Sequence, residues 1–460
     1  MNILIRPLTI DDAEISYKWR NDPEIWKFTE NRPNKEITWK IEKEWLKNTL
    51  ADKSNARFAI IVDNVYVGNV QLTEITPSQS AQFHIFLGEK FFWGRGVARQ
   101  ATYQILVYAR EILNLNYVFL KVNKHHLSAI ELYKNNGFKV MDEVDDFITM
   151  KHYLKDLHPP MVSVFCMVYN HEKYIAQAIE GFLMQRTSFN SIMVIGEDCS
   201  NDGSRRIILD YVKKYPGKFK ILLSHKNLGA HNNQELVLKN CTGKYVAMCE
   251  GDDCWTDPLK LQKQVDFMET NRDYSGVGTN SEVIYEYSTR SRHLFKDYKE
   301  RTLGINDFLM SRPFHTATFL FKKDIYKEDF PKNILSADRA LFMLTACYGK
   351  IKLLSDVTAV YRRNETGLSR SVKSNQMMKD YAIAKYILKY TNDLDYYRAQ
   401  SFVAYTVFAY SQEIYFFDFI KNSYLLLYYK LKRDSSLSYR YVFYNNFKLI
   451  YRSFKKVKFG

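Results

Sequence analysis

The chain has 460 residues, of which 46% are hydrophobic and 25% are charged, and its formal net charge at pH 7 is +15. The length predicts about three domains of ordinary size, and the composition excludes a wholly disordered chain. The positive charge indicates an anionic partner, and nucleic acid, a phospholipid surface or a phosphorylated substrate would each satisfy it.

The cysteines and the N-terminal residues both favour a reducing location. The six cysteines include no CxxC pair and no zinc-site spacing, so buried reduced thiols explain them best. The N-terminal residues lack the basic segment and long apolar core of a signal peptide, and no run of about 18 apolar residues could span a bilayer. We therefore expect a cytoplasmic protein.

Residues 1 to about 155 are expected to form a first domain. Its predicted elements are a strand (4–8), a helix (39–50), a hairpin (58–72), a strand (82–88), a helix (99–109), and a further strand and short helix up to a glycine C-cap at Gly137. A glycine-bearing turn joins the strand over 82–88 to the helix that follows. In such a turn the backbone can approach an anion, and the free N–H groups and dipole of the helix attract it. The turn therefore predicts an anion site, with an ordinary strand-to-helix turn as the alternative.

The turn is Gly94-Arg95-Gly96-Val97-Ala98, and the later short helix and its C-cap contain Leu132-Tyr133-x3-Gly137-Phe138. These two motifs resemble the pyrophosphate loop for acetyl-coenzyme A and the last core motif of the GNAT family of N-acetyltransferases, in the branch that holds ribosomal-protein and nucleotide-amino-sugar acetyltransferases. The resemblance implies a mixed-sheet domain with acetyl-CoA as co-substrate. The implied acetyl-CoA-binding residues are Ile85, Phe86, Leu87, Gly94, Arg95, Gly96, Val97 and Ala98.

The resemblance also implies that Tyr133 protonates the departing thiolate. A phenol suits this role because a thiolate leaving group needs only modest help. A buried core aromatic is the alternative for Tyr133. His84, Glu74 and His126 are candidates for the general base, and none is assigned. Two positions depart from the family pattern: Trp93 replaces a Gln or Arg, and His126 replaces an Asn.

Residues 156–160 (Asp-Leu-His-Pro-Pro) predict a short, proline-stiffened linker to a second domain over 161–370. Apolar strands alternate there with helices, which predicts a parallel sheet covered by helices on both faces. Ligands bind outside the carboxyl ends of such strands. Polar residues follow three of the expected strands: Tyr169 and Asn170; Asp198; and Glu250, Asp252 and Asp253. The three carboxylates of the last group predict a hard-cation site, with a metal-free acidic turn as the alternative.

The second domain resembles a family 2 glycosyltransferase with the GT-A fold. The residues that carry the resemblance are Val164-x4-Tyr169-Asn170-x-Glu172-x-Tyr174-Ile175, Glu197-Asp198-x-Ser200-x-Asp202-Gly203-Ser204, Asn227-x-Gly229, Glu250-Gly-Asp252-Asp253-x-Trp255, Phe314-His315-Thr316, Asp338-x2-Leu341-Phe342 and Tyr361-Arg362. Glu250 stands where the family's DxD motif has its first Asp. The fold expected for this part is a Rossmann-like α/β domain.

This resemblance implies an inverting, metal-dependent transfer from a nucleotide sugar. Its implied donor-binding residues are Tyr169, Asn170, Glu172, Asp198, Glu250, Asp252 and Arg362. Asp252 and Asp253 would hold Mg²⁺ or Mn²⁺, which stabilises charge on the leaving diphosphate. A carboxylate at Asp198 can accept the imide N–H of uracil or thymine, which favours a UDP- or dTDP-linked sugar. Asp338 matches the position of the base, and an N-cap of the following helix is its alternative role.

The last 90 or so residues predict helices rich in Tyr and Phe. Between Leu431 and Gly460, eight lysine or arginine residues are interleaved with aromatics, against a single acid. A basic, aromatic amphipathic helix suits an anionic membrane surface at the inner face of the cell membrane. A helical subdomain packed on the catalytic domain is the alternative. No motif supports nucleic-acid binding.

Together the two resemblances predict a bifunctional enzyme of bacterial-type surface polysaccharide or glycoconjugate synthesis. One domain would N-acetylate an amino sugar. The other would transfer a sugar to a glycan, a lipid-linked acceptor or a protein. The alternative is a glycosyltransferase whose GNAT domain only binds or scaffolds, or acetylates a protein.

Overall fold

The computed structural model describes residues 1–28, 35–52, 54–297, 299–309, 311–327, 329–364, 372–434 and 436–458. The chain forms two compact units. One consists of Met1–His225 with Asn240–Lys244, and the other of Lys226–Lys239 with Tyr245–Gly460. The first unit therefore contains the whole expected acetyltransferase domain and the first strands of the second domain. The expected boundary between residues 370 and 371 lies outside the described residues.

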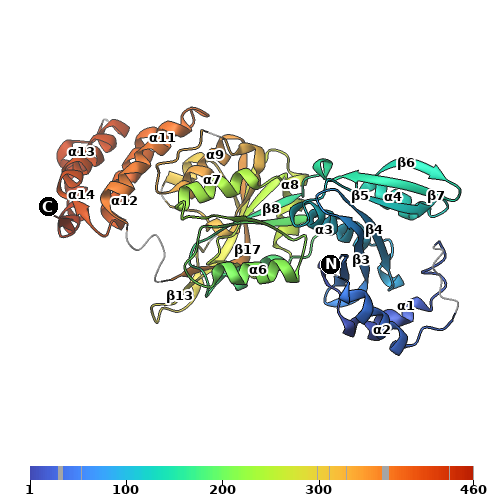
Figure 1. The fold of residues 1–460 in the computed structure, drawn as a ribbon. Helices are drawn as coiled ribbons and strands as arrows, with labels where there is room; N and C mark the ends of the chain where they lie inside the picture. The colour runs from blue at the N-terminus through green and yellow to red at the C-terminus, as the bar shows by residue number, and fades with distance from the viewer. Residues whose placement is uncertain are drawn as a thin grey trace. The chain divides into compact units, whose positions relative to one another are not determined.

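A seven-stranded mixed sheet forms the N-terminal part of the first unit, in the order β1-β2-β3-β4-β5-β7-β6 (Figure 1). Its strands are β1 (Ile3–Pro7), β2 (Ala56–Val62), β3 (Val65–Thr76), β4 (Ser80–Leu87), β5 (Tyr117–Asn123), β6 (Lys139–Val144) and β7 (Phe147–Tyr153), and its helices are α1 (Ala13–Arg20), α2 (Trp39–Ala51), α3 (Val97–Glu111) and α4 (Leu127–Asn135). Only β4 and β5 run parallel; the other neighbours are antiparallel. The mixed-sheet prediction is confirmed.

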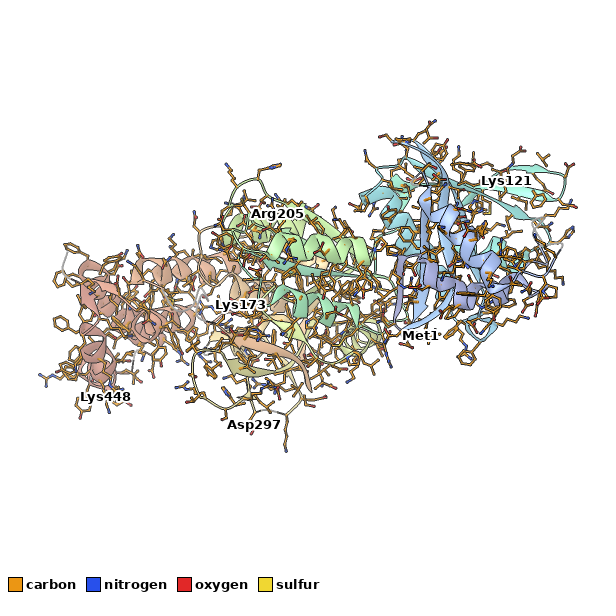
Figure 2. The ribbon with its side chains drawn as sticks, turned by 60° about the horizontal axis from the view of Figure 1, so that its bottom comes forward. Met1, Lys121, Lys173, Arg205, Asp297 and Lys448 are labelled. Carbon is orange, nitrogen blue, oxygen red and sulfur yellow. The ribbon has the colours of Figure 1, made fainter. Side chains whose placement is uncertain are left out.

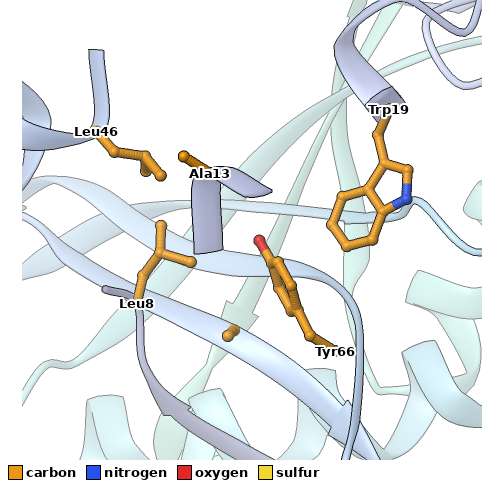
Figure 3. Close-up of a cluster of buried hydrophobic side chains, with 6 residues drawn as sticks. Leu8, Ala13, Trp19, Leu46 and Tyr66 are labelled. Atoms are coloured by element: carbon orange, nitrogen blue, oxygen red, sulfur yellow. The ribbon is translucent and has the colours of Figure 1, made fainter. Parts of the chain in front are cut away.

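One hydrophobic cluster fixes α1 and α2 on this sheet (Figure 3). Its buried members are Leu8, Ala13, Trp19, Leu46, Ala59 and Tyr66. The Trp19 ring also lies where a side chain on Gly88 would be: a Cβ there would come within 1.9 Å of the indole. The Trp19 indole N–H donates to Glu89 at 3.0 Å, so the residues after β4 are held against α1.

The rest of the first unit is a parallel three-stranded layer in the order β10-β9-β8. Its elements are β8 (Val162–Val168), α5 (Ile175–Leu183), β9 (Ser191–Glu197), α6 (Ser204–Lys214) and β10 (Phe219–Leu223). Every residue of β9 is buried, as expected for a strand covered on both faces. The parallel prediction is confirmed for these strands.

Helix α3 of the acetyltransferase part packs directly on this layer. The buried Gln100 amide donates to the Thr187 carbonyl at 3.1 Å, and the Arg99 guanidinium donates to the Ser188 carbonyl at 3.3 Å. Gly217 approaches α3 so closely that a Cβ there would lie 2.0 Å from the Gln104 carbonyl oxygen. The close tethering expected from the short linker is therefore accompanied by direct side-chain and backbone contacts.

The second unit contains strands in the order β11-β16-β13-β17-β12. Its elements up to residue 364 are α7 (Ala230–Asn240), β11 (Tyr245–Met248), β12 (Cys254–Trp255), α8 (Lys260–Thr270), β13 (Tyr274–Tyr285), β14 (His293–Leu294), β15 (Arg301–Leu303), β16 (Leu320–Lys322), α9 (Ala337–Cys347) and β17 (Lys350–Arg363). Strand β16 is antiparallel to β11 and to β13, whereas β13 and β17 are parallel. The expectation of a parallel sheet is therefore wrong for this unit, since β16 runs against both of its neighbours. The sequence could not predict this direction, because β16 has only three residues and apolar periodicity carries no information on strand direction.

The C-terminal part of the second unit is helical (Figure 1). It contains α10 (Ser374–Met377), α11 (Tyr381–Ile387), α12 (Tyr396–Tyr410), α13 (Phe416–Arg433) and α14 (Tyr439–Phe454), with the short parallel pair β18 (Ile414–Tyr415) and β19 (Val457–Lys458). A buried cluster of Ala404, Phe408, Ile414 and Leu426 holds α12 and α13 together, with Leu449 and Ile450 of α14 packed against it. These helices therefore share a hydrophobic core of their own.

Candidate functional site

The loop before α3 has the geometry expected of an anion-binding turn. Gly94 and Gly96 adopt positive φ angles of 70° and 78°, which glycine tolerates without strain. A Cβ on either would meet no atom within 4 Å, so the space in front of the loop is open. Gly96 is the N-cap of the 15-residue α3, whose first N–H groups follow directly. Arg95, from the same loop, stacks on the Phe91 ring at 3.8 Å.

Strand β4 offers a backbone edge next to this loop. Its parallel pairing with β5 extends only from Ser80 to Gln82, whereas its pairing with β3 continues to Leu87. The strands β4 and β5 therefore separate after Gln82. Among the described residues, no ladder pair occupies the β5 side of Ile85, Phe86 or Leu87. The Trp93 indole N–H donates to the Leu87 carbonyl at 3.0 Å and closes one end of this edge.

Tyr133 lies on α4, in the region where β4 and β5 diverge. Its ring packs edge-on against Phe83, with centroids 5.9 Å apart, and against Phe138 at 5.8 Å. Burial raises the pKa of Tyr133 to about 12. The phenol therefore keeps its proton at neutral pH, as a group that donates a proton to a thiolate must.

The three base candidates occupy different surroundings. The His84 ring lies 2.9 Å from the Thr73 hydroxyl, and burial lowers the pKa of His84, so the imidazole is neutral. Glu74 sits at a register shift in β3 with a φ of 50°. The His126 ring stacks on Phe28 at 4.4 Å, and burial lowers the pKa of His126 as well. Only His84 therefore combines a neutral ring with a place on β4.

In the glycosyltransferase part of the first unit, the loops after β8 and β9 are tied together by hydrogen bonds. The Asn170 backbone N–H donates to the Ser200 hydroxyl at 3.0 Å, and the side-chain oxygen of Asn170 accepts from the Asn201 N–H at 2.8 Å. The Glu172 N–H donates to Asp202 at 3.0 Å, and Asp202 also accepts from the Ser204 N–H. Asn170, with a φ of 57°, makes the turn that permits these contacts.

Asp198 and Tyr169 lie at the carboxyl ends of β9 and β8. The Asp198 side chain is almost fully buried, and its N–H donates to the Val168 carbonyl at 2.9 Å. The Tyr169 side chain, by contrast, is 42% exposed. Behind them, the Glu197 carboxylate is buried and paired with Arg205 at 2.5 Å. In the first unit, Asn170 and Glu172 therefore contact the loop that follows Asp198, and Tyr169 and Asp198 follow neighbouring strands. Their binding of a sugar donor stays a prediction.

In the second unit the acidic turn after β11 is fastened to the end of β17. The Arg362 N–H donates to the Asp253 carboxylate at 3.0 Å, and the Arg362 side chain donates to the Asp252 carbonyl at 3.1 Å and to Glu286 at 3.0 Å. The Asn364 amide donates to the Asp252 carboxylate at 3.0 Å. The guanidinium of Arg362 therefore holds the turn in place.

Glu250 and Asp338 are near neighbours with opposite pKa shifts. Burial, with the negative charges of Asp252 and Asp338, raises the pKa of Glu250 to about 8. Burial alone would also raise the pKa of Asp338, but Arg312 and the Arg339 N–H outweigh it and hold this pKa below its usual range. Arg312 donates to Asp338 at 2.6 Å. Asp338 is therefore ionised at neutral pH.

Asp338 lies within the first turn of α9 and does not occupy its N-cap, because the helix begins at Ala337 and Ser336 is the N-cap. The Asp380 carboxylate accepts from the N–H groups of Leu335 at 2.7 Å and Ser336 at 3.0 Å, and lies 3.7 Å from Arg339. A carboxylate at a helix N-terminus satisfies N–H groups that have no partner within the helix. The C-terminal helical part thus stabilises the turn that carries Asp338.

His315 lies under the acidic turn. Its ring stacks on Tyr361 with centroids 3.8 Å apart, and its Nδ1 lies 3.6 Å from the Asp253 carboxylate. Burial, with the charge of Arg312, lowers the pKa of His315 to about 3, so the ring is neutral despite this neighbour. Nδ1 accepts from the Ala317 N–H, so the ring supports the backbone there.

The described residues contain no group of three His, Cys, Asp or Glu side chains arranged to hold a metal ion. Asp252 is suited to be one ligand of such an ion: one of its carboxylate oxygens accepts from Asn364, and the other accepts no hydrogen bond from the described residues. Asp253 is buried, with its oxygens near the Arg362 N–H and the His315 ring. The assignment of Asp253 as a ligand stays a prediction.

Asp198 belongs to the first unit and Asp252 to the second, so their meeting in one crevice also stays a prediction. Sequence reasoning missed several residues of the cluster in the second unit: Arg312, Asn364, Glu286 and Asp380. The sequence held a signal for two of them: Arg312 lies two residues before the quoted Phe314-His315-Thr316 motif, and Asn364 lies two residues after Tyr361-Arg362.

Comparison with protein families identifies both domains. Residues 2–139 match the family described as Acetyltransferase (GNAT) domain, and residues 163–330 match Glycosyl transferase family 2. The chain therefore contains a GNAT acetyltransferase domain followed by a family 2 glycosyltransferase domain. The predicted order of domains and the α/β fold class are confirmed.

Relatives match part of the chain. An uncharacterized Mycobacterium tuberculosis protein, Rv1520, is 34% identical over 215 residues, which are 47% of this chain and 62% of the relative. The Bacillus subtilis protein TuaG, named as a glycosyltransferase of teichuronic acid biosynthesis, is 35% identical over 109 residues, 24% of this chain and 42% of TuaG. The chain spans about three fifths of the length of the first of these relatives.

Two solved structures align with part of the chain. Spermidine N-acetyltransferase from Vibrio cholerae is 23% identical, with a TM-score of 0.31, and covers 34% of this chain and 96% of its own. Staphylococcus aureus TarS with UDP-GlcNAc is 18% identical, with a TM-score of 0.46, and covers 64% of this chain and 87% of its own.

None of the helices in the described part of our chain is long and apolar enough to cross a membrane.

Proposed function

We propose that the protein is a bifunctional enzyme of bacterial-type surface polysaccharide or glycoconjugate synthesis. Its second domain transfers a sugar from a UDP- or dTDP-linked donor to a glycan, lipid-linked or protein acceptor. Its first domain acetylates an amino sugar with acetyl-CoA. The observation that carries the glycosyl-transfer proposal is the ionised Asp338 beside Arg312, next to the Glu250-Gly-Asp252-Asp253 turn.

In the proposed glycosyl transfer, Asp338 accepts the proton of the acceptor hydroxyl as the oxygen attacks the anomeric carbon. The bond from that carbon to the diphosphate breaks, and the leaving nucleoside diphosphate takes the electron pair. Attack from the face opposite the leaving group inverts the anomeric centre. Tyr169, Asn170, Glu172, Asp198 and Glu250 bind the donor. A Mg²⁺ or Mn²⁺ ion on Asp252 would supply charge neutralisation on the diphosphate when bound.

In the proposed acetyl transfer, an amine attacks the thioester carbonyl of acetyl-CoA and the carbon–sulfur bond breaks. The Tyr133 hydroxyl donates its proton to the thiolate, and its high pKa keeps that proton available. The open loop around Gly94 and Gly96 receives the pyrophosphate, and the separated edge of β4 pairs with the pantetheine arm. His84 is neutral and so is competent to receive the proton of the amine.

The fusion of the two domains favours an amino sugar as the acetyl acceptor, because joined domains suit consecutive steps on one product. A second candidate function makes the GNAT domain a binding module, or an enzyme that acetylates a protein. The close packing of α3 on the glycosyltransferase layer is compatible with a module that has mainly a structural role.

The test uses the full chain with Mn²⁺ or Mg²⁺ and a panel of UDP- and dTDP-sugars, and measures release of the nucleoside diphosphate. Thiol release from acetyl-CoA is measured in parallel with nucleotide-linked amino sugars. We expect Asp252→Ala and Asp338→Asn to abolish only the first activity and Tyr133→Phe only the second. Acetylation of peptides but of no amino sugar would overturn the bifunctional proposal. If no acetyl transfer were detected, the remaining candidate would be a GNAT domain that acts only as a binding module.

A further inference from the structure

Helix α14 has one face in the core and one in solvent. Val442, Asn446 and Ser453 are buried against the helices beneath. The outer side carries aromatic residues, most of them three or four positions apart, which places them along one face of a helix: Phe443, Tyr444, Phe447 and Tyr451, between 40% and 81% exposed. Phe454 lies at the edge of this face; it is 47% exposed, and its ring also packs on Phe419 of α13 at 5.6 Å. Phe443 packs on Phe447 at 5.8 Å, and Phe447 stacks on Tyr451 at 5.9 Å. The aromatic rings therefore form a continuous ridge.

Helix α13 also has one buried side and one exposed side. Its inner side contributes Asn422, Leu426 and Leu427 to the core. Its outer side exposes Phe417, Ile420, Tyr424 and Tyr428, again at helical spacing. Exposed large apolar side chains occur singly on most proteins, whereas contiguous groups mark interaction sites. The exposed apolar stripes of α13 and α14 therefore mark a candidate interaction surface.

The charge of this region identifies the kind of partner. Residues 416–460 contain ten lysine or arginine residues and two aspartates. Arg440, Lys448, Arg452 and Lys455 are exposed, and none of them takes part in an ion pair within the described residues. Figure 2 shows Lys448 on the outer C-terminal helices, among side chains that extend away from the ribbon. A surface of opposite charge would neutralise these residues.

We propose that this aromatic–basic face of α14 (Phe443, Tyr444, Phe447, Tyr451 and Phe454 with Arg440, Lys448 and Lys455), together with the outer stripe of α13, docks on an anionic lipid bilayer. A helix with aromatics on one face and basic residues beside them lies in the plane of the interface. Tyr rings place an apolar body at the acyl boundary and a hydroxyl among the headgroups. The basic side chains then reach the anionic headgroups.

A nucleic acid fits this face less well. Proteins that bind single strands use a concave basic groove with aromatic platforms, whereas this ridge is the convex outer side of a helix. No recognition motif for a nucleic acid is present in the sequence. The proposal does not depend on the proposed reaction, because the face shares no residue with either candidate active site.

The test is cosedimentation of the full chain with vesicles of phosphatidylcholine alone and of phosphatidylcholine mixed equally with phosphatidylglycerol. We expect binding only to the anionic vesicles, and weaker binding at high salt because screening reduces the attraction. Replacing Phe443, Phe447 and Tyr451 together by Ser should lower the fraction bound by about tenfold, because buried apolar area contributes to interfacial binding. Replacing Arg440, Lys448 and Lys455 by Glu should abolish binding.

Matched controls separate docking from misfolding. Tyr405 and Tyr410 of α12 are also exposed aromatics, and their replacement by Ser should leave vesicle binding unchanged. All variants alter exposed side chains, so their thermal unfolding should match that of the unmodified protein. Equal binding to both vesicle types, or none to either, would overturn the proposal. Retained vesicle binding in the triple Ser variant would also overturn the proposal. The same holds if that variant loses RNA binding or self-association while its vesicle binding is unchanged.

Discussion

The Arg312 guanidinium donates to the carboxylate of Asp338 at 2.6 Å, and this ion pair sets the charge of the proposed base. Without the cation, burial and the nearby Glu250 would raise the pKa of Asp338. We therefore expect Arg312→Gln to move the acidic limb of the pH–rate profile for glycosyl transfer upward, by about one pH unit or more. The measurement is the rate of nucleoside diphosphate release against pH.

Arg301→Gln provides the control for this substitution, because Arg301 forms an exposed pair with Asp307. It should leave the pH–rate profile unchanged. An unshifted acidic limb in Arg312→Gln, with the variant folded, would contradict the role of the ion pair.

Tyr133→Phe should lower the rate of thiol release from acetyl-CoA by about 100-fold or more, because it removes the proton donor to the thiolate. The Michaelis constant for acetyl-CoA should change little, since the ring and its packing against Phe83 and Phe138 remain. Tyr108→Phe removes a hydroxyl from α3 and serves as the control. Full activity of Tyr133→Phe would assign Tyr133 to the core alone.

Gly217→Ala should destabilise the protein, with a lower thermal unfolding midpoint. Gly217 has a φ of 78°, and its Cβ would lie 2.0 Å from the Gln104 carbonyl oxygen of α3. Gly229 has a φ of 79° but open space around a Cβ, so Gly229→Ala imposes only the backbone strain, about 1 kcal/mol. The first variant should therefore unfold at a clearly lower temperature than the second. Equal midpoints would show that the contact between α3 and the glycosyltransferase layer contributes little.

Lys260 makes the stability of the protein depend on pH. Its side chain is fully buried, with its ammonium nitrogen 2.7 Å from the Gln264 side chain and 4.4 Å from the Trp255 ring centroid, and burial lowers its pKa to about 7. The unfolded chain, with an ordinary lysine pKa of about 10.4, binds more protons between these two values. The free energy of unfolding should therefore rise as the pH increases from about 7 to about 10.

Lys260→Met should flatten this slope, whatever its effect on the absolute stability. The measurement is the midpoint of urea unfolding at a series of pH values. An unchanged slope in the variant would exclude Lys260 as the cause.

Local sequence patterns predicted most of the elements that surround the site. The glycine turn before α3, the buried strand β11 and the carboxylates after it depend on neighbouring residues, so the sequence contains their signals. The same is true of Asn170, whose turn lies between β8 and the helix that follows.

Interactions between distant residues could not be predicted in this way. Arg312 and Asp338 lie 26 positions apart, and Asn364 and Asp252 lie 112 positions apart. Ser200, Asp202 and Ser204 resemble site residues in the sequence, but in the structure they tie two loops together. The direction of β16 depends on its partners β11 and β13, which a three-residue segment does not specify.

The Asp380 carboxylate, which accepts from the N–H groups of Leu335 and Ser336, comes from beyond the region that matches the glycosyltransferase family. A protein shortened after residue 364 would keep every residue of the proposed reaction and yet lose the acceptor that orders the start of α9. Attempts to isolate a minimal sugar-transferring fragment should therefore retain α10 and the turn that follows it. We therefore expect the C-terminal extension to support the proposed sugar transfer in addition to the proposed membrane docking.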